Sequence, residues 1–367
     1  MRCPVCYSRN SEQIFDLGPR PLSVSALQPT ARESMDLPRY EIRIRVCHSC
    51  SHVFNSHFDS DVDQYSGDGC TMYNDGHSWT AHVDDMVRYV NSIDSTLVVE
   101  IGPGDGKFLS QINGDVVGYE PSDDCHKCTE RGLRCYKKYF EPNTHLEDGS
   151  LVVMRHVLEH IHDPTDFLET LAIANENQEL DIIIEVPCIE NALTDCRLED
   201  WTYEHPNHFT ESSLRHALER SGWNVAYIFR TYGGEVLVAR ATLSNGDRTG
   251  TRTVVKDFQE LRVSIDEFRI TDQPYVFWGG AGKSTMFLHA LARDYDYVVD
   301  SDTRKWGKYV PGLSLRIESP SHITSDDVVI ITTNWREQDI LAEIRLRGLK
   351  PAAVYTYKNG ELHASQV

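Results

Sequence analysis

The most constraining feature of this chain is an apolar run that ends in an acid and three glycines, Leu97–Gly106. Val98 and Val99 predict a buried strand, and the glycines predict a tight turn into a helix that begins near Lys107. Because glycine has no Cβ, such a turn can bring its backbone into contact with a ligand. A second apolar run, Val116–Glu120, ends in another acid, which can accept hydrogen bonds from ribose hydroxyls. Together they predict a site for an adenosine-containing ligand.

The spacing of the glycines argues against a dinucleotide. Gly102, Gly104 and Gly106 stand at alternate positions, whereas the dinucleotide fingerprint requires G-x-G-x-x-G. Glu100 disfavours a diphosphate and favours a ligand with a cationic end. The pattern E-x-G-x-G-x-G resembles the first motif of class I S-adenosylmethionine methyltransferases. The resemblance implies that this cofactor binds these four residues and Glu120.

Composition restricts the remaining possibilities. A length of 367 residues allows two or three domains. The net charge of −20 disfavours nucleic acid and anionic membrane surfaces as partners. No apolar run reaches the length of a membrane span, and no hydrophobic signal segment begins the sequence, so we expect a cytoplasmic protein. Cysteines in that compartment are expected to be thiols or metal ligands.

Two C-x-x-C pairs near the N-terminus predict a structural zinc site. Each pair can place two thiolates on one tetrahedral ion, and four sulfurs leave no open position. Zinc would then supply folding energy to the segment between the pairs. The alternative is a redox pair or four unrelated thiols. The four ligands are Cys3, Cys6, Cys47 and Cys50. A third C-x-x-C pair, Cys125 and Cys128, has no partner pair. These two cysteines and the four remaining ones are expected to be ordinary thiols; the four are Cys70, Cys135, Cys188 and Cys196.

The middle of the chain alternates predicted strands and helices. The predicted strands are Ser150–Met154 and Asp181–Pro187. One predicted helix covers Trp79–Ile93, and a second begins at Asp163. A third covers Ser212–Ser221 and has Thr210 as its N-cap. A hairpin about Gly233 and Gly234 follows. This order predicts a doubly wound sheet with one antiparallel edge. Because ligands bind beyond the carboxyl ends of such strands, His156 and His160 are expected beside the glycine turn.

The loop Asp200–Phe209 is expected to face the same cleft. It gathers acids, histidines and aromatic residues, among them the adjacent pair Glu204 and His205. Imidazole can take up a proton near neutral pH, and a neighbouring carboxylate can orient it. The alternative is that this pair caps the following helix or lies in solvent.

The C-terminal third predicts a second nucleotide-type fold. A linker, Ser244–Gly250, and a helix over Val254–Phe268 precede a strand, a glycine turn and a helix in Pro274–Ser284. The Walker spacing is not met, because Phe277 stands where a glycine is required, so ATP hydrolysis is excluded. Thr285 likewise breaks the dinucleotide spacing. We expect the turn to hold a diphosphate, and the alternative is that it packs a helix.

The order of these motifs resembles the three-part sugar C-methyltransferases that act on nucleotide-linked deoxysugars in antibiotic pathways. The resemblance implies an α/β chain with a central doubly wound, Rossmann-like methyltransferase domain over residues 73–243. It also implies a zinc-binding domain over residues 1–72 and a second Rossmann-like domain, which helps to bind the sugar nucleotide, over residues 244–367. The motifs that carry it include Ser78-Trp79, His156–His160, Gly279–Lys283, Gly307–Gly312 and Asn334.

The resemblance also implies roles for single residues. His205 would be the base, Glu204 its neighbour, and His160 a partner on the substrate side. Tyr203 would join this catalytic group and His156 the cofactor site, while the substrate would contact Tyr73, Gly280, Lys283 and Asn334. The sequence departs from the family pattern in three places. Thr202–His205 reads Thr-Tyr-Glu-His where Tyr-His-Glu-His is typical, Glu235 replaces a serine, and Tyr73 is an approximate counterpart of a family tyrosine.

We therefore expect methyl transfer from S-adenosylmethionine to the carbon next to the ketone of a nucleotide-linked 4-keto sugar. This route requires no catalytic metal. The altered loop leaves O- or N-methylation of a sugar nucleotide or another small metabolite as the alternative. A non-catalytic ligand-binding scaffold and a dehydrogenase are alternatives of other classes. The protein is expected to be a monomer or a small homo-oligomer.

Overall fold

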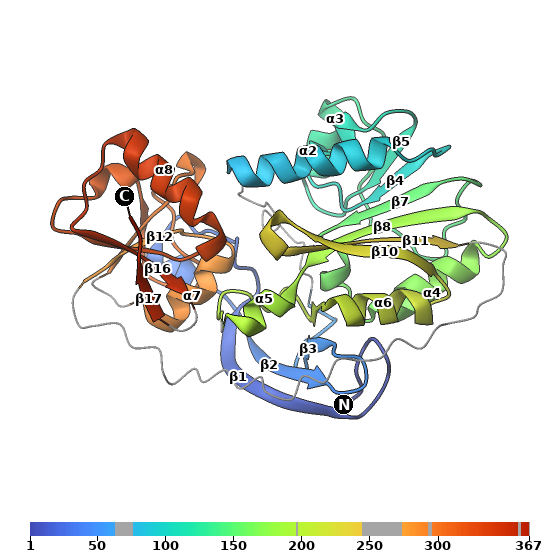
Figure 1. Ribbon diagram of the computed structural model, residues 1–367, viewed down its shortest axis with the longest axis horizontal. Coiled ribbons are helices and arrows are strands. Elements are labelled where there is room, and N and C mark those ends of the chain that lie inside the picture. Colours follow the sequence, from blue (N-terminus) through green and yellow to red (C-terminus); the bar gives the residue numbers. More distant parts are fainter. Residues whose placement is uncertain (63–75, 196, 244–273, 293–295, 359–360, 367) are drawn as a thin grey trace.

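A computed structural model describes residues 1–62, 76–195, 197–243, 274–292, 296–358 and 361–366. The strands within these residues form three sheets, one each in the N-terminal, central and C-terminal parts of the chain (Figure 1). The boundary expected near residue 72 falls outside the described residues, whereas Leu243, the last residue before the second expected boundary, ends a strand and is followed by residues outside them. The linker, the helix over Val254–Phe268, Tyr73, Cys70 and Cys196 also lie outside the described residues.

The central sheet confirms the predicted α/β organisation. Its seven strands run in the order β10 (Asn224–Thr231), β11 (Val236–Leu243), β8 (Leu180–Pro187), β7 (Leu151–Arg155), β4 (Val98–Ile101), β5 (Val116–Tyr119) and β6 (Cys135–Tyr136). The strands from β8 to β6 pair in parallel, while β10 and β11 form the predicted antiparallel edge. The strands at the centre are largely apolar because helices cover both faces of a parallel sheet, and the buried acids Glu100 in β4 and Glu185 in β8 are exceptions.

Helices cover the central sheet on its two sides (Figure 1). On one face, α2 (His77–Asn91) packs Met86 and Val90 against Val98; on the other, α4 (Pro164–Ala174) and α6 (Glu211–Arg220) pack against Val99. The predicted N-cap is confirmed, because Thr210 accepts a hydrogen bond from the first turn of α6. The shorter helices of this part are α3 (Cys125–Glu130) and α5 (Ile189–Thr194).

The helix expected from Lys107 is a single short turn instead. It is the 3₁₀ segment η1 (Leu109–Gln111), in which the backbone N–H of Ile112 reaches only to the carbonyl of Leu109. Gly114 adopts a left-handed φ of 85° directly afterwards and turns the chain into β5. The chain therefore leaves the helical conformation after one turn and enters β5 at Val116.

The N-terminal sheet contains a strand from the middle of the chain. Its order is β1 (Ser11–Pro21), β2 (Arg39–Cys47), β3 (Val53–Asn55) and β9 (Asn207–His208), with α1 (Ala31–Met35) between the first two. Strand β9 belongs to the loop Asp200–Phe209 and pairs antiparallel with β3. The N-terminal sheet therefore holds the loop that the sequence marks as a candidate site.

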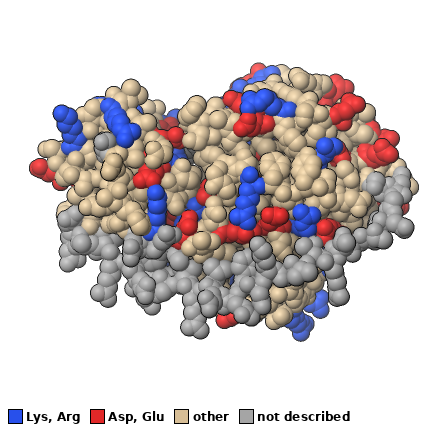
Figure 2. All heavy atoms as spheres, in the orientation of Figure 1, with Lys and Arg blue, Asp and Glu red and all other residues tan. Residues whose placement is uncertain are grey.

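The C-terminal sheet has the predicted second strand–turn–helix unit. Its order is β14 (Ile317–Glu318), β13 (Tyr297–Val299), β12 (Val276–Trp278), β15 (Val328–Ile331), β16 (Ala353–Lys358) and β17 (Glu361–Ala364). All pairs are parallel except the last, and α7 (Lys283–Leu291) and α8 (Glu337–Arg347) accompany them. Within the described ranges, no helix combines the length and the apolar character that a bilayer crossing requires. On the face shown in Figure 2, lysine and arginine side chains are interspersed with acidic and uncharged ones.

Candidate active site

A cavity of about 680 Å³ lies where the three parts of the chain meet. Its wall includes Gly102, Gly104, Glu120 and His156, which follow the carboxyl ends of β4, β5 and β7. Residues of the loop Asp200–Phe209 and of the C-terminal glycine turn complete the wall. This placement agrees with the predicted position of a ligand beyond the carboxyl ends of parallel strands.

The glycines of the first turn serve two different purposes. Gly102, Gly104 and Gly106 all have left-handed φ values, of 73°, 55° and 76°. A Cβ at Gly102 would lie 2.6 Å from Val157 Cγ2, and one at Gly106 would lie 2.6 Å from Cys128 Sγ. A Cβ at Gly104 would meet no protein atom within 4 Å. The outer two glycines are therefore required by packing, whereas Gly104 presents bare backbone to the cavity.

Glu120 is held directly against this turn. Its Oε2 accepts a hydrogen bond of 2.9 Å from the Gly104 N–H, and its Oε1 accepts one of 2.9 Å from the Ser122 N–H. The carboxylate lines the cavity, so it can also accept hydrogen bonds from ribose hydroxyls there. The turn and this acid fit an adenosine-containing cofactor. Glu100, in contrast, is 2% exposed and lies behind the wall, where burial raises the pKa of its carboxyl to about 8.

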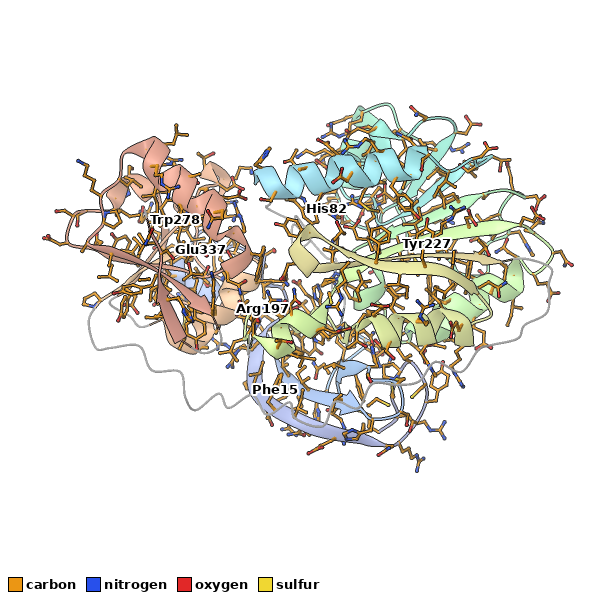
Figure 3. The ribbon with its side chains drawn as sticks, viewed as in Figure 1. Phe15, His82, Arg197, Tyr227, Trp278 and Glu337 are labelled. Atoms are coloured by element: carbon orange, nitrogen blue, oxygen red, sulfur yellow. The ribbon has the colours of Figure 1, made fainter. Side chains whose placement is uncertain are left out.

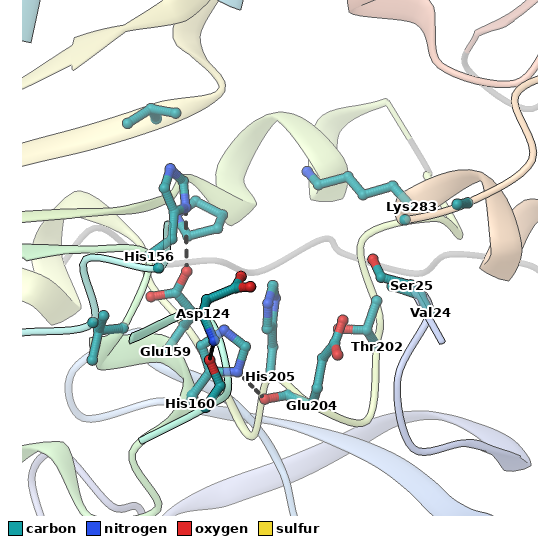
Figure 4. A pocket seen from close by; sticks show the side chains of 18 of the residues that line it. Val24, Ser25, Asp124, His156, Glu159, His160, Thr202, Glu204, His205 and Lys283 are labelled. Carbon is teal, nitrogen blue, oxygen red and sulfur yellow. Dashed lines mark hydrogen bonds and ion pairs between the residues drawn. The ribbon is translucent and has the colours of Figure 1, made fainter. Parts of the chain in front are cut away.

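Two histidines and a carboxylate meet on the cavity wall (Figure 4). The His160 and His205 rings are perpendicular, with centroids 4.6 Å apart, and donor atoms of both lie within 4.8 Å of a Glu159 oxygen. His160 Nδ1 donates a hydrogen bond of 2.7 Å to the Glu204 carbonyl. Burial lowers the pKa of both imidazoles, and that of His205 falls well below its usual range. Both rings are therefore neutral at neutral pH.

The Glu204 carboxyl points away from the His205 ring. Burial raises its pKa to about 7, although hydrogen bonds from Ser23 and from the backbone of Val24 oppose the rise. No hydrogen bond joins this carboxyl to His205 in the part of the chain that the structure describes. Glu204 is expected to orient His205 or to stabilise its imidazolium, and in this structure the carboxyl instead turns toward Ser23.

The raised pKa of Glu204 predicts a pH-dependent stability. The folded chain keeps the proton up to about pH 7, whereas the unfolded chain releases it near the ordinary value of 4.5. The folded chain therefore binds more protons over this window, and its stability falls as pH rises through it. Glu204→Gln removes the titrating carboxyl. The unfolding free energy of the variant should therefore rise relative to that of wild type as the pH increases from 4.5 to about 7.

Urea unfolding at a series of pH values measures this difference. Glu130→Gln, which removes an exposed carboxyl from α3, is the matched control. If the difference between Glu204→Gln and wild type is constant with pH, or follows that of the control, the carboxyl of Glu204 does not titrate as described.

A buried charge network under the cavity was not found from the sequence. Glu185 on β8 is fully buried, and its carboxylate binds both Arg155 (3.0 Å) and His156 (3.0 Å). His82 from α2 lies 3.1 Å from the same carboxylate. Burial alone would lower the pKa of His156, but hydrogen bonds to Glu159 and Glu185 raise it to about 9. The only signal in the sequence was an acid inside an apolar strand, Ile-Ile-Ile-Glu-Val.

A second network joins the candidate loop to the C-terminal part. Buried Arg197 lies where the two parts meet (Figure 3) and pairs with Asp200 at 3.0 Å and Glu235 at 2.9 Å. Lys283, at the start of α7, also pairs with Asp200. The ring of Trp335 lies under both cations, at 4.9 Å from Arg197 and 4.8 Å from Lys283. Glu235, the acid that departs from the family pattern, therefore has a structural partner.

Tyr203 lies outside the cavity, which corrects its expected catalytic role. The side chain is 1% exposed and stacks on Tyr40 of β2 at 4.8 Å. Its hydroxyl accepts a hydrogen bond of 2.8 Å from the Asp59 N–H. Because β9 pairs with the N-terminal sheet, the loop turns this tyrosine into the core between them.

The C-terminal glycine turn contains both packing and cavity positions. A Cβ at Gly279 would lie 2.4 Å from Thr332 Oγ1, and one at Gly280 would lie 2.6 Å from Ile317. The Gly280 N–H also donates to Asp300 at 2.8 Å, so packing against the sheet explains this glycine better than substrate contact. Lys283 lines the cavity, while Asn334 stands just outside the wall and accepts a hydrogen bond from Arg197.

The four N-terminal cysteines come together as predicted. Cys3 and Cys50 have their sulfurs 3.6 Å apart, and those of Cys6 and Cys47 are 3.4 Å apart. All four lie within 4.8 Å of one another. A tetrahedral zinc ion with Zn–S bonds of about 2.3 Å needs sulfurs about 3.8 Å apart, so the four cysteines fit such an ion.

Among the other cysteines, Cys125 is not isolated, because its sulfur lies 3.2 Å from that of Cys135.

Comparison with known proteins supports the central part of this description. Residues 83–228 match the family model of a methyltransferase domain. No curated protein matches the sequence.

The solved structures that resemble part of this chain include methyltransferases. One, an S-adenosylmethionine-dependent methyltransferase from Aquifex aeolicus, shows 17% identity and a TM-score of 0.35 over 44% of this chain and 89% of its own. Another, a possible histamine N-methyltransferase from Thermotoga maritima, shows 17% identity and a TM-score of 0.37 over 46% of this chain and 91% of its own. Similarity of this degree indicates nothing about the substrate.

Proposed function

We propose, from the premise that the chain is an S-adenosylmethionine-dependent methyltransferase, that its acceptor is the carbon next to the ketone of a nucleotide-linked 4-keto sugar. One observation carries the proposal. His160 and His205 stand together on a cavity wall that runs from the cofactor turn to the C-terminal glycine turn. A base at that place is needed for a carbon acceptor, whereas a heteroatom nucleophile needs less activation.

Gly104 and Glu120 would hold the adenosine end of the cofactor, whose sulfonium supplies an electrophilic methyl group. At the acceptor, the ketone makes the neighbouring C–H acidic because the resulting enolate spreads its charge onto oxygen. His205, which burial keeps neutral, accepts that proton on its ring nitrogen. The carbon would then take the methyl group with the electron pair of the former C–H bond, and the methyl–sulfur bond would break to leave a neutral thioether.

His160 would position the sugar rather than donate to the enolate oxygen, because its one N–H already donates to the Glu204 carbonyl and Nε2 can only accept. Its Nδ1–H is held by the Glu204 carbonyl at 2.7 Å, which fixes the orientation of the ring. Lys283 would meet the anionic part of the nucleotide in competition with Asp200. The four cysteines would hold a structural zinc ion, and we keep the boundaries 1–72, 73–243 and 244–367 as proposed domains.

Solvent exchange tests the carbon acceptor. The protein is incubated in deuterium oxide with a panel of nucleoside diphosphate 4-keto-6-deoxyhexoses and without S-adenosylmethionine. We expect deuterium at the carbon next to the ketone of one of these sugars, and transfer of a methyl group to the same carbon when the cofactor is added. Methyl transfer to oxygen or nitrogen without any exchange would instead establish a heteroatom acceptor.

Gly104→Ala should separate cofactor binding from folding. The added methyl group would lie in the cavity rather than against the protein, so the fold should lose only the left-handed strain of about 1–2 kcal/mol. Affinity for S-adenosylhomocysteine should fall by about tenfold or more, a cost of at least about 1.4 kcal/mol. Calorimetric titration and thermal unfolding measure the two effects.

Gly132→Ala is the matched control for this variant. Gly132 has a φ of 81°, and a Cβ there also meets nothing within 4 Å, but it lies away from the cavity wall. The control should show a similar loss of stability with unchanged affinity. Equal affinities for S-adenosylhomocysteine in the two variants would show that the cofactor does not bind at the Gly102–Gly106 turn.

A further inference from the structure

We propose that Glu159, His160 and His205 form a binding site for a divalent transition-metal ion, and that an ion bound there stops His205 from acting as a base. The binding site stands on the geometry of these three residues. Its inhibitory effect rests on the proposed function. It would be a second metal site, separate from the four cysteines.

The three side chains come from two elements that meet on the cavity wall. The 3₁₀ segment η2 (Leu158–His160) supplies Glu159 and His160, and the loop before β9 supplies His205. One donor atom from each lies within 4.8 Å of the other two. Ligands on one ion at about 2.0–2.2 Å stand no more than about 4.4 Å apart, so small side-chain rotations bring them into coordination.

Glu159 is a buried carboxylate with unused acceptor capacity. The residue is 1% exposed, and its Oε1 lies 3.3 Å from His156 Nδ1. Its Oε2 has no hydrogen-bond partner within the described part of the chain. Leaving a buried acceptor unsatisfied costs about 1–3 kcal/mol, and an ion would remove this cost. Figure 4 shows the Glu159 carboxylate close to His160, below the His156 ring.

His160 already has the orientation that metal-binding histidines adopt. Its Nδ1–H donates to the Glu204 carbonyl at 2.7 Å, which places the lone pair of the ring on Nε2. A backbone carbonyl on the other ring nitrogen is the usual outer partner of a histidine ligand. Burial also keeps both histidines in the neutral form that binds metal.

The donor set points to a class of ion. Two imidazoles and one carboxylate suit Zn²⁺, Co²⁺, Ni²⁺ or Fe²⁺ better than Mg²⁺, which prefers oxygen ligands. Three protein ligands leave coordination positions open, whereas the four cysteines close theirs. Because His205 binds through the same lone pair that accepts a proton, ion binding and base catalysis exclude each other.

Cobalt is the probe for the site. Co²⁺ is titrated into the full-length protein with zinc already bound by the four cysteines. We expect a further equivalent of Co²⁺ with visible d–d absorption but without the near-ultraviolet charge-transfer band that thiolate ligands give. Glu159→Gln and His160→Asn should each lose that absorption. His162→Asn, which changes a neighbouring exposed histidine, should keep it.

Two results would overturn the site. One is a wild-type protein that takes up no further Co²⁺; the other is absorption that survives in both Glu159→Gln and His160→Asn while far-ultraviolet circular dichroism shows them folded. Either is independent of catalysis. Inhibition is measured separately, as loss of methyl transfer on adding Zn²⁺ and its recovery with a weak chelator. Cobalt binding without any methyl transfer to the sugars would contradict the proposed function and leave the site in place.

Discussion

His205→Ala is expected to lower kcat by about 10²–10⁴-fold, the usual contribution of a general base. Affinity for S-adenosylhomocysteine should stay within about twofold of wild type, because Gly104 and Glu120 lie on another part of the wall. Single-turnover kinetics with a competent sugar nucleotide measure the first effect, and calorimetry measures the second.

The control and its counterpart decide which group is the base. His162→Ala removes a nearby histidine that lines the cavity and stacks on Phe58, and it should retain most of the activity. Burial holds the pKa of His205 well below its usual range but raises that of Glu204 to about 7. Near-normal turnover in His205→Ala together with a large loss in Glu204→Gln would transfer the role to the carboxylate.

Cys47→Ser is expected to unfold the N-terminal part of the chain and to abolish zinc binding. A structural zinc ion contributes about 10–16 kcal/mol in small zinc domains, which equals or exceeds the whole stability of an ordinary domain. The damage should reach the active site, because β3 pairs with β9 and His52 hydrogen-bonds Asn207 at 2.8 Å. Metal analysis measures zinc binding, circular dichroism measures folding, and a methyl-transfer assay measures the effect on the active site.

The matched control is Cys135→Ser, which changes a half-buried thiol of the central sheet. It should keep one zinc ion per chain and most of the activity. Retention of one zinc ion and an unchanged melting transition in Cys47→Ser would show that the four cysteines do not form a structural metal site.

Local patterns predicted much of the fold. Val98 and Val99 pack on opposite faces of a parallel sheet, and Thr210 caps α6, because both properties depend on neighbours in the chain. The spacing of the cysteine pairs likewise brought four sulfurs together. The 3₁₀ turn η1 was missed because its length depends on where β5 must pair, which local periodicity does not report.

The active site could be predicted only in part. His160 and His205 were identified as types suited to proton transfer, and the structure brings their rings to 4.6 Å. Tyr203 and Glu204 differ from expectation because pairing of β9 with β3 sets which way each side chain points. The partners of Glu185 come from α2 and β7, elements that are remote in sequence.

The sequence by itself determined the strand–turn–helix order, the glycine turn with its two acids, and the chemistry that the metal and proton-transfer groups can perform. Only the tertiary structure decided which of those groups share a cavity, which are buried in the core, and which pKa values shift. The physical reason is range: backbone conformation follows from residues a few positions apart, whereas desolvation and charge pairing depend on side chains that only folding brings together.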